Sequence, residues 1–359
     1  MVLRECYRRV PLRGIEPYLR GDSGIVLCAA PLVLHLYDWM LWSDDGALLP
    51  LLHRYEKQPV HLLLSFSWER ACDTAVEDRN SINWLAEWHA RHLHKHPNHR
   101  IIYLANTEPQ RDRLRAAGFD AVFVSQNALV SPETYRPLAD AVKRFDAVYD
   151  ARILPYKRHQ LASRVPRLAL VTARTQGLFQ KGYTRQVRDW LAHAHWFNDP
   201  LDRGYRYLLP DEVNACVNQA WVGLCLSAEE GAMFASIQYL LAGLPVVSTR
   251  SIGGRDVFFE DDYACIVDDD PDAVAEGVAR ICRQAPPAHA IRERVMRKIG
   301  EHRARLLDVL HAIVGDGPGA ADLSTVWARW GAHPAGTGPI SAAGMLAKVD
   351  GFARPTAGI

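Results

Sequence analysis

Short apolar runs alternate with amphipathic segments along most of the chain. In the first third, the apolar runs predict buried strands at residues 24–29, 60–66, 101–105 and 121–125. Residues 81–96 carry apolar side chains at helical spacing, and a second helix is expected to open at Thr107 and to stop at Gly118. Strands that alternate with helices are typical of a parallel, doubly wound sheet.

The same alternation returns after a segment that contains Pro132 and Pro137, so the chain is expected to form two domains. Strands are predicted at 146–150, 168–172, 195–198, 221–226, 245–248 and 264–267. Helices are predicted at 233–241, 272–283 and 288–313. We place a first domain at 1–140 with a linker at 126–143, and a second at 144–315. A C-terminal segment follows at 316–359, and its Gly-, Ala- and Pro-rich end predicts a poorly ordered tail.

Composition is that of a soluble globular protein, with 359 residues, 48% apolar and 23% charged. The formal charge of +1 gives no global field for nucleic acid. Seven scattered cysteines without a CxxC pair favour reduced thiols in a cytoplasmic protein. The N-terminal arginines precede no apolar run that would make a signal peptide, although they leave peripheral contact with an anionic membrane open. The apolar stretch 25–41 is interrupted by polar residues and too short to span a bilayer.

The segment after the predicted strand 221–226 is acidic and contains glycine: Ser227-Ala228-Glu229-Glu230-Gly231. A helix follows it, and Gly243-Leu244-Pro245 ends that helix before the next strand. A helix that begins directly at a strand end presents free N–H groups and a positive dipole end, which suit a phosphate. The Glu230 carboxylate beside it suits sugar hydroxyls. This segment therefore predicts a site for a phosphate joined to a polyol.

A second segment, Arg152 to His159, follows the predicted strand 146–150. A guanidinium at Arg152 and an ammonium at Lys157, near a helix N-terminus, suit a diphosphate whose negative charge grows as it leaves a sugar. Taken alone, these residues could equally be two surface cations on a loop. Their place before the Glu230 segment favours the functional interpretation.

Together the two segments resemble the family 4-like glycosyltransferases of the GT-B fold. In that family a Glu-Gly pair is followed by a second Glu at plus eight, a Gly at plus thirteen and a Pro at plus fifteen. Here Glu230-Gly231, Gln238, Gly243 and Pro245 stand at those positions, with an amide in place of the second acid. Arg152 and Lys157 also match the family in spacing. The alternative is an ordinary strand–turn–helix–turn–strand unit.

The resemblance implies an α/β protein of GT-B fold, with two Rossmann-like doubly wound domains facing a cleft. It also implies that the C-terminal segment 316–359 crosses back to the first domain. It implies transfer of a sugar from a nucleoside-diphosphate sugar to an unknown acceptor, a glycan, lipid, protein or small molecule. It further implies retention of configuration, no cofactor and no metal. By this resemblance, Arg152 and Lys157 of this chain would stabilise the departing diphosphate. Glu230 would hold the hydroxyls of the donor sugar, the backbone of Gly231 would approach the sugar or the phosphate, and Gln238 would lie near the ribose.

Other polar clusters have plainer interpretations. Asp268-Asp269-Asp270 precedes a predicted helix and is expected to form a solvated turn at its start rather than a metal site. Five histidines between His89 and His99 are expected to lie on a wet, charged helix surface. The family's glycine-rich loop after the first strand is replaced by Ala29-Ala30-Pro31. Two alternatives stay open: a nucleotide-sugar epimerase of GT-B fold, and a catalytically idle binding or scaffold protein.

Overall fold

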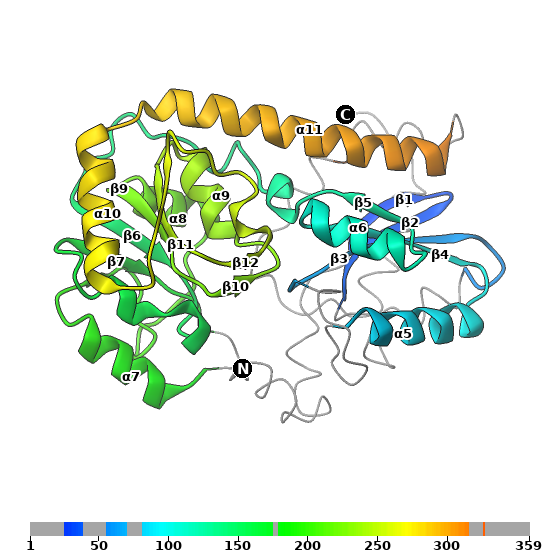
Figure 1. The fold of residues 1–359 in the computed structure, drawn as a ribbon, viewed down its shortest axis with the longest axis horizontal. Coiled ribbons are helices and arrows are strands. Elements are labelled where there is room, and N and C mark those ends of the chain that lie inside the picture. The colour runs from blue at the N-terminus through cyan, green and yellow to red at the C-terminus, as the bar shows by residue number, and fades with distance from the viewer. Residues whose placement is uncertain (1–24, 39–54, 70–80, 175–178, 316–325, 327–359) are drawn as a thin grey trace. The chain divides into compact units, whose positions relative to one another are not determined.

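A computed structural model describes residues 25–38, 55–69, 81–174, 179–315 and 326 (Figure 1). The chain divides into two compact units. In the described part, the N-terminal unit comprises residues up to 129 together with those from 301 onward, and the C-terminal unit comprises 130–300. Each unit is built on its own sheet.

The N-terminal unit contains a five-stranded sheet in the order β1-β2-β3-β4-β5. These strands are β1 (Ile25–Ala29), β2 (Leu32–Tyr37), β3 (Val60–Ser65), β4 (His99–Ala105) and β5 (Ala121–Phe123). The strands from β2 to β5 pair in parallel, whereas β1 is antiparallel to β2. The sequence predicts a single strand before residue 60. This prediction is wrong, because a second strand, β2, follows β1 and forms a hairpin with it. The turn at Ala30-Pro31 folds the apolar stretch back, and both of its halves enter the core.

Alternate residues of the central strand β3 face opposite layers of this unit. Leu62 and Leu64 pack in one core cluster with α5 (Ile82–Lys95) and α6 (Glu108–Ala116). Leu63 packs in the other cluster with residues of α11 (Ala288–Val314). Helices thus cover both faces of the sheet, as Figure 1 shows for α5 and α11. This is the doubly wound arrangement that the sequence predicts.

Helix ends in this unit follow the expected capping chemistry. The hydroxyl of Ser81 accepts a hydrogen bond from the backbone N–H of Trp84 at 3.1 Å, and Thr107 accepts one from Gln110 at 3.1 Å. Each such cap contributes about 1 kcal/mol to helix stability. Gly118 follows α6 with a φ of +85°, a left-handed conformation that glycine adopts without strain.

The C-terminal unit contains a six-stranded, wholly parallel sheet in the order β13-β11-β9-β6-β7-β8. Its strands are β6 (Phe145–Asp150), β7 (Leu168–Val171), β8 (His195–Trp196), β9 (Ala220–Cys225), β11 (Val246–Thr249) and β13 (Ala264–Val267). All six were predicted from their apolar runs, to within two residues at each end. The helices are α7 (Lys181–Trp190), α8 (Pro210–Val217), α9 (Phe234–Leu241) and α10 (Pro271–Gln284). The sequence did not predict α7 or α8.

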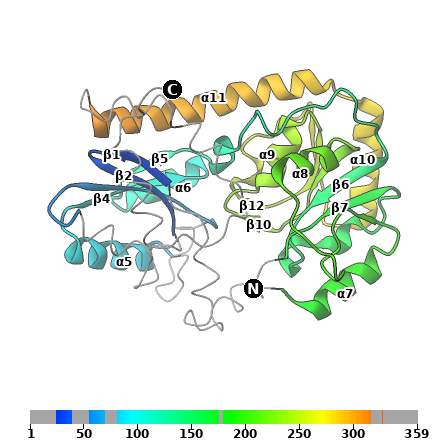
Figure 2. The ribbon, with the colours of Figure 1, turned by 180° about the vertical axis from the view of Figure 1, so that it is seen from behind.

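Helices α9 and α10 cover opposite faces of this second sheet. Gly223 of β9 lies directly beneath Tyr239 of α9. Gly277 of α10 lies against Val247 of β11, whose side chain points to the other face from that of Val246, the register partner of Gly223. Figure 2 shows the face that α8 and α9 cover. Small residues at both contacts let the helices approach the strands closely.

The boundaries of the two units differ from those placed by sequence. Residues 301–314 of α11 belong to the N-terminal unit, because Leu306 and Leu310 pack into its core. The continuous helical periodicity of residues 288–313 predicts them in the second domain, which is wrong for this part of the helix. Val326 joins the same core, and the rest of the segment 316–359 lies outside the described residues. The N-terminal arginines also lie outside them.

Histidines at the end of α5 and the start of β4 form a cluster, whereas a wet surface was expected. His92 and His99 are joined through Nε2 and Nδ1 at 2.9 Å, and the rings of His96 and His99 stack at 4.6 Å. Burial lowers the pKa of His92 to about 3 and that of His99 to about 4. The prediction of a solvated face is therefore wrong for His92 and His99, whereas His94 is exposed as predicted. Among the described residues, no group of three or more His, Cys, Asp or Glu is placed to hold a metal ion.

The described cysteines are all free thiols, and four of the five are buried. This agrees with the expectation of reduced, buried thiols for the part of the chain that the structure describes. Within that part, no helix is long and apolar enough to cross a bilayer.

Candidate functional site

The two predicted motif segments follow neighbouring strands of the C-terminal sheet. Strands β6 and β9 pair in parallel at its centre. Arg152 and Lys157 follow β6, and Glu230 follows β9. Both segments therefore leave the sheet at its carboxyl edge, which is where open α/β sheets bind ligands.

The segment after β6 forms two short 3₁₀ turns, η2 (Pro155–Lys157) and η3 (His159–Ala162). The expectation that Lys157 stands at the start of a longer helix is wrong, and no α-helix dipole acts there. Tertiary hydrogen bonds fix the turn instead. The Tyr149 hydroxyl donates to the Lys157 carbonyl at 2.5 Å, and the Ala228 N–H donates to the Tyr156 carbonyl at 3.2 Å. The second bond joins this turn to the Glu230 segment.

The segment after β9 also differs from its prediction. Helix α9 begins at Phe234, so it does not start directly at the strand end. Between the two lies a short strand, β10 (Glu229–Glu230), which pairs in parallel with β12 (Ile252–Gly253). The sequence predicted neither strand, because two residues are too few for a hydrophobic period to appear. Glu230 is held by this pairing and not by a helix N-terminus.

Lys157 and Glu230 form a buried ion pair, joined by a short hydrogen bond from Nζ to Oε1. Their side chains are only 9% and 8% exposed, so the two charges neutralise each other largely out of water. Burial by itself lowers the pKa of Lys157, but the adjacent Glu230 carboxylate outweighs it and the pKa is raised. Residues 73 positions apart are thus brought into direct contact.

The remaining predicted site residues have different surroundings. Arg152 is exposed and forms no ion pair with any residue that the structure describes. The Gly231 carbonyl accepts a hydrogen bond from Gly254 N–H at 2.9 Å. Gln238 is half-buried on α9, and its Oε1 has no partner in the described part of the chain. No hydrogen bond or ion pair joins Gln238 to Lys157 or Glu230 among the described residues.

Asp150 adds a carboxylate at the end of β6 that the sequence analysis did not single out. The backbone N–H of Asp150 donates a hydrogen bond to the Tyr239 hydroxyl at 2.6 Å, and this bond holds the backbone in place. Burial raises the pKa of the Asp150 carboxyl to about 6, and the positive charges of Lys157 and Arg152 lower it only in part. An acid of this kind changes charge between pH 5 and 7, beside two cations.

Because its pKa is raised, Asp150 should make the free energy of unfolding fall as the pH rises. Between about pH 4, the usual carboxyl pKa, and about pH 6, the folded protein keeps a proton that the unfolded chain has released. This contribution to stability is present below pH 4 and is lost as the pH rises through 6. Asp150→Asn should therefore gain stability relative to the parent protein over this interval. Urea unfolding at pH 4.5 and pH 7 measures it, with the exposed Asp140→Asn as control. Parallel pH profiles for D150N and the parent would contradict the assignment.

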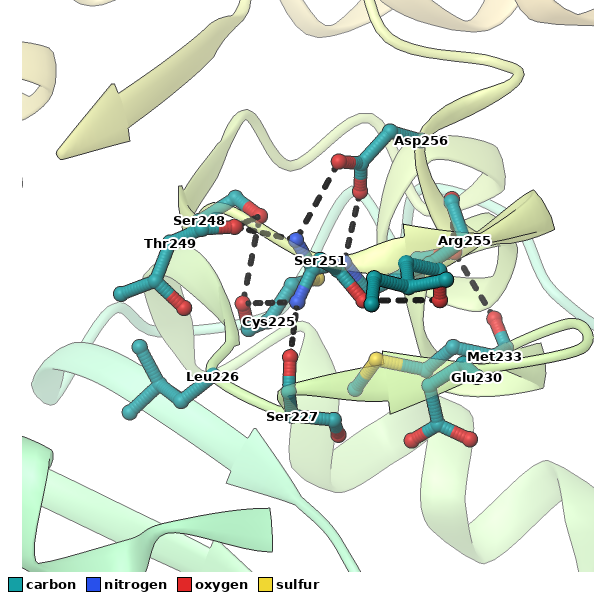
Figure 3. Close-up of polar contacts among 12 residues, drawn as sticks. Cys225, Leu226, Ser227, Glu230, Met233, Ser248, Thr249, Ser251, Arg255 and Asp256 are labelled. Carbon is teal, nitrogen blue, oxygen red and sulfur yellow. Dashed lines mark hydrogen bonds and ion pairs between the residues drawn. The ribbon is translucent and has the colours of Figure 1, made fainter. Parts of the chain in front are cut away.

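Two arginines near the site were not identified from the sequence. Arg158, at a φ of +52°, donates to the Leu226 carbonyl at 2.6 Å and to Thr249 Oγ1 at 2.6 Å. Arg255 lies fully buried among the carbonyls where β9 and β11 end (Figure 3). The one local signal for Arg255 is its place after Gly253-Gly254, close behind an apolar strand.

The acidic run at residues 268–270 has the plain role that was predicted. Asp270 is the N-cap of α10 and accepts hydrogen bonds from the N–H groups of Asp272 and Ala273, both at 3.0 Å. Asp269 pairs with Arg158 at 2.5 Å. These carboxylates are engaged in a cap and an ion pair.

Comparisons with known proteins define the fold class. No family model matches the chain, and no curated protein matches it in sequence. Solved structures do match. Sucrose-phosphate synthase from Thermosynechococcus elongatus aligns with a TM-score of 0.56 at 15% identity, over 78% of this chain and 74% of that one. TarM aligns with a TM-score of 0.53 at 14% identity, over 78% of this chain and 54% of that one.

The pneumococcal O-GlcNAc transferase GtfA, solved with UDP and GlcNAc, aligns with a TM-score of 0.52 at 14% identity. The alignment covers 74% of this chain and 55% of GtfA, so the chain spans about half the length of TarM and GtfA. These neighbours are glycosyltransferases of the GT-B fold, and the GT-B fold class predicted from the sequence is confirmed. At such low identity, the likeness concerns the fold alone.

Proposed function

We propose that this protein is a glycosyltransferase that moves a sugar from a nucleoside-diphosphate sugar to an acceptor, with retention of configuration and without a metal. The observation that carries the proposal is the buried contact between Lys157 and Glu230. It joins the two segments that resemble the family 4-like motifs, at the carboxyl ends of adjacent central strands. GtfA, a structural neighbour, was solved with UDP, which agrees with a nucleotide-sugar donor.

In this proposal the cations receive the diphosphate. Arg152 is exposed and unpaired among the described residues, so its guanidinium can bind a phosphate without first breaking an ion pair. The Lys157 ammonium stabilises the charge that develops as the diphosphate leaves. Glu230 and Gly231 bind the donor sugar, and Gln238 accepts a hydrogen bond from the ribose. The acceptor can be a glycan, lipid, protein or small molecule.

A binding screen tests the proposal directly. The probes are UDP, GDP and ADP, the corresponding nucleosides and the glucose and N-acetylglucosamine conjugates of the diphosphates, read by thermal shift. A ligand at 100 times its dissociation constant adds about 2.7 kcal/mol of stability. Arg152→Ala should lower the affinity for diphosphates and leave the affinity for nucleosides unchanged. Arg164→Ala, at an exposed arginine, serves as the matched control. A protein that binds none of these probes would contradict the proposal.

Product analysis separates the remaining functions. A transferase releases the nucleoside diphosphate faster when acceptor is added, whereas an epimerase converts the donor sugar without any acceptor. Binding without turnover would identify an idle scaffold. The same assay in excess EDTA tests the metal-free mechanism, and activity that is lost on chelation and restored by manganese or magnesium would contradict it.

Gln238 should make the protein discriminate weakly between ribose and 2′-deoxyribose donors. Its amide has one accepting oxygen, which is buried and has no partner among the described residues, whereas a carboxylate accepts from both ribose hydroxyls. We expect Gln238→Glu to sharpen the preference for ribose by about 1 kcal/mol. Dissociation constants for a nucleoside diphosphate and its 2′-deoxy form, in both proteins, measure the effect. Equal ratios would show that Gln238 does not contact the ribose.

A further inference from the structure

Arg255 lies in the turn η4 (Gly254–Asp256) and is the largest side chain with no exposed surface in the described protein. Its guanidinium fills the space where strands β9 and β11 end (Figure 3). Nη1 donates to the carbonyls of Cys225 at 2.9 Å and Ser227 at 2.7 Å. Nη2 donates to the carbonyl of Thr249, and Nε to Asp256 at 2.6 Å.

A guanidinium has five N–H donors, and all five are used here, because Nη2 also reaches Asp256 at 3.2 Å. Arg255 therefore has neither surface nor donors left for a ligand. Its influence on the site passes through the backbone that it holds and through its positive charge, which interacts electrostatically with the Glu230 carboxylate. A lysine offers three donors on a narrower head and cannot satisfy the same fork of acceptors.

The backbone held by Arg255 is the one that carries Glu230. Ser227, three residues before Glu230, gives its carbonyl to the guanidinium. Gly231, directly after Glu230, gives its carbonyl to the N–H of Gly254 at 2.9 Å, and Glu230 itself pairs in register with Gly253. Both ends of the Glu230 turn are thus attached to the Gly253–Arg255 segment.

We propose that Arg255 is a positioning residue that holds the Glu230 carboxylate in place for the sugar of the donor. The inference rests on the proposed function. Glu230 makes no ion pair with Arg255, and its carboxylate is engaged by Lys157 from the turn η2, which follows the neighbouring strand β6. Because the turn is short and fastened at both ends, a shift at Arg255 moves Glu230 relative to the Lys157 ammonium.

The test compares Arg255→Lys with Arg292→Lys. Arg292 is a matched control, since it also donates to three backbone carbonyls, those of Pro132, Tyr135 and Leu241. The probes are UDP, UDP-glucose and UDP-N-acetylglucosamine, or the GDP or ADP set if the parent protein prefers that base. We expect R255K to weaken binding of the nucleotide sugar about tenfold and binding of the bare diphosphate less than twofold. A loss of this size corresponds to one misplaced charge-assisted hydrogen bond. R292K should leave both affinities unchanged.

Glu230→Gln supplies the second arm. If Arg255 acts through the Glu230 carboxylate, R255K should cost little further affinity for the nucleotide sugar in the E230Q background. Equal losses in both backgrounds, or equal losses for diphosphate and nucleotide sugar, would overturn the proposal and leave Arg255 a purely structural residue. If R255K does not fold, Asp256→Asn loosens the guanidinium and should give the same pattern at smaller size.

A readout that needs no donor separates this inference from the proposed function. In R255K, backbone amides of residues 228–232 should exchange with deuterium at least tenfold faster, while those of β7 keep the parent rate. Unchanged exchange in the turn would overturn the positioning role. A parent protein that binds no nucleotide, but whose R255K variant shows faster exchange, would contradict the donor site while the hold on the Glu230 turn stands.

Discussion

Lys157→Ala is expected to lower the free energy of unfolding by about 3–5 kcal/mol, because it leaves the Glu230 carboxylate buried without its counter-charge. The same change should slow sugar transfer far more than it weakens nucleoside binding. The ammonium is needed most as the diphosphate departs, and the nucleoside does not depend on it. Urea unfolding measures the first effect, and turnover with the dissociation constant of the nucleoside measures the second.

A matched control and a double variant separate these effects. Lys298 pairs with Glu260 at 3.0 Å in the same unit, but both side chains are about one quarter exposed. Lys298→Ala should cost at most about 1 kcal/mol and leave turnover intact. Lys157→Met combined with Glu230→Leu removes both charges and should recover most of the lost stability without recovering activity. An unchanged turnover rate in Lys157→Ala would remove Lys157 from the mechanism.

Gly223→Ala is expected to destabilise the C-terminal unit by about 3 kcal/mol, the upper part of the usual range for overpacking. A Cβ atom at this position would lie 2.2 Å from Tyr239 Cδ2 and 2.8 Å from Tyr239 Cβ. The tyrosine cannot rotate away from a clash that includes its own Cβ, so helix α9 must move off strand β9. Tyr239 is also held at its far end, where its hydroxyl bonds to the Asp150 backbone.

Gly300→Ala provides the control for this prediction. No atom lies within 4 Å of a Cβ at Gly300, which stands inside α11, so alanine there should stabilise the helix by about 0.5–1 kcal/mol. Urea unfolding of both variants measures the difference. Adding Tyr239→Leu to Gly223→Ala should cost less than the sum of the two changes, because the second relieves the clash made by the first. Strict additivity would show that the two residues do not touch.

Elements whose cause is local could be predicted from the residues alone. The inner strands β7, β9 and β11 of the C-terminal sheet are nearly continuous apolar runs between turn residues, as required of parallel strands buried on both faces. The helix starts at Ser81, Thr107 and Asp270 follow from side chains that accept hydrogen bonds from the first turn. Motif spacing, through the family resemblance, also brought Lys157 and Glu230 to the same candidate site.

Other features depend on contacts between residues far apart in the chain, so no local pattern predicts them. The sequence around an apolar residue such as Leu306 does not show which core it will pack into. Helix α11 therefore runs from one unit into the other without a break in its periodicity. The Glu230 turn is shaped by its pairing with β12 and not by the helix that follows it. Arginine is a residue type that is mostly exposed in proteins, and the sequence alone does not mark Arg255 as an exception. Arg255 is buried because three carbonyls at the ends of β9 and β11 and the carboxylate of Asp256 satisfy every donor of its guanidinium.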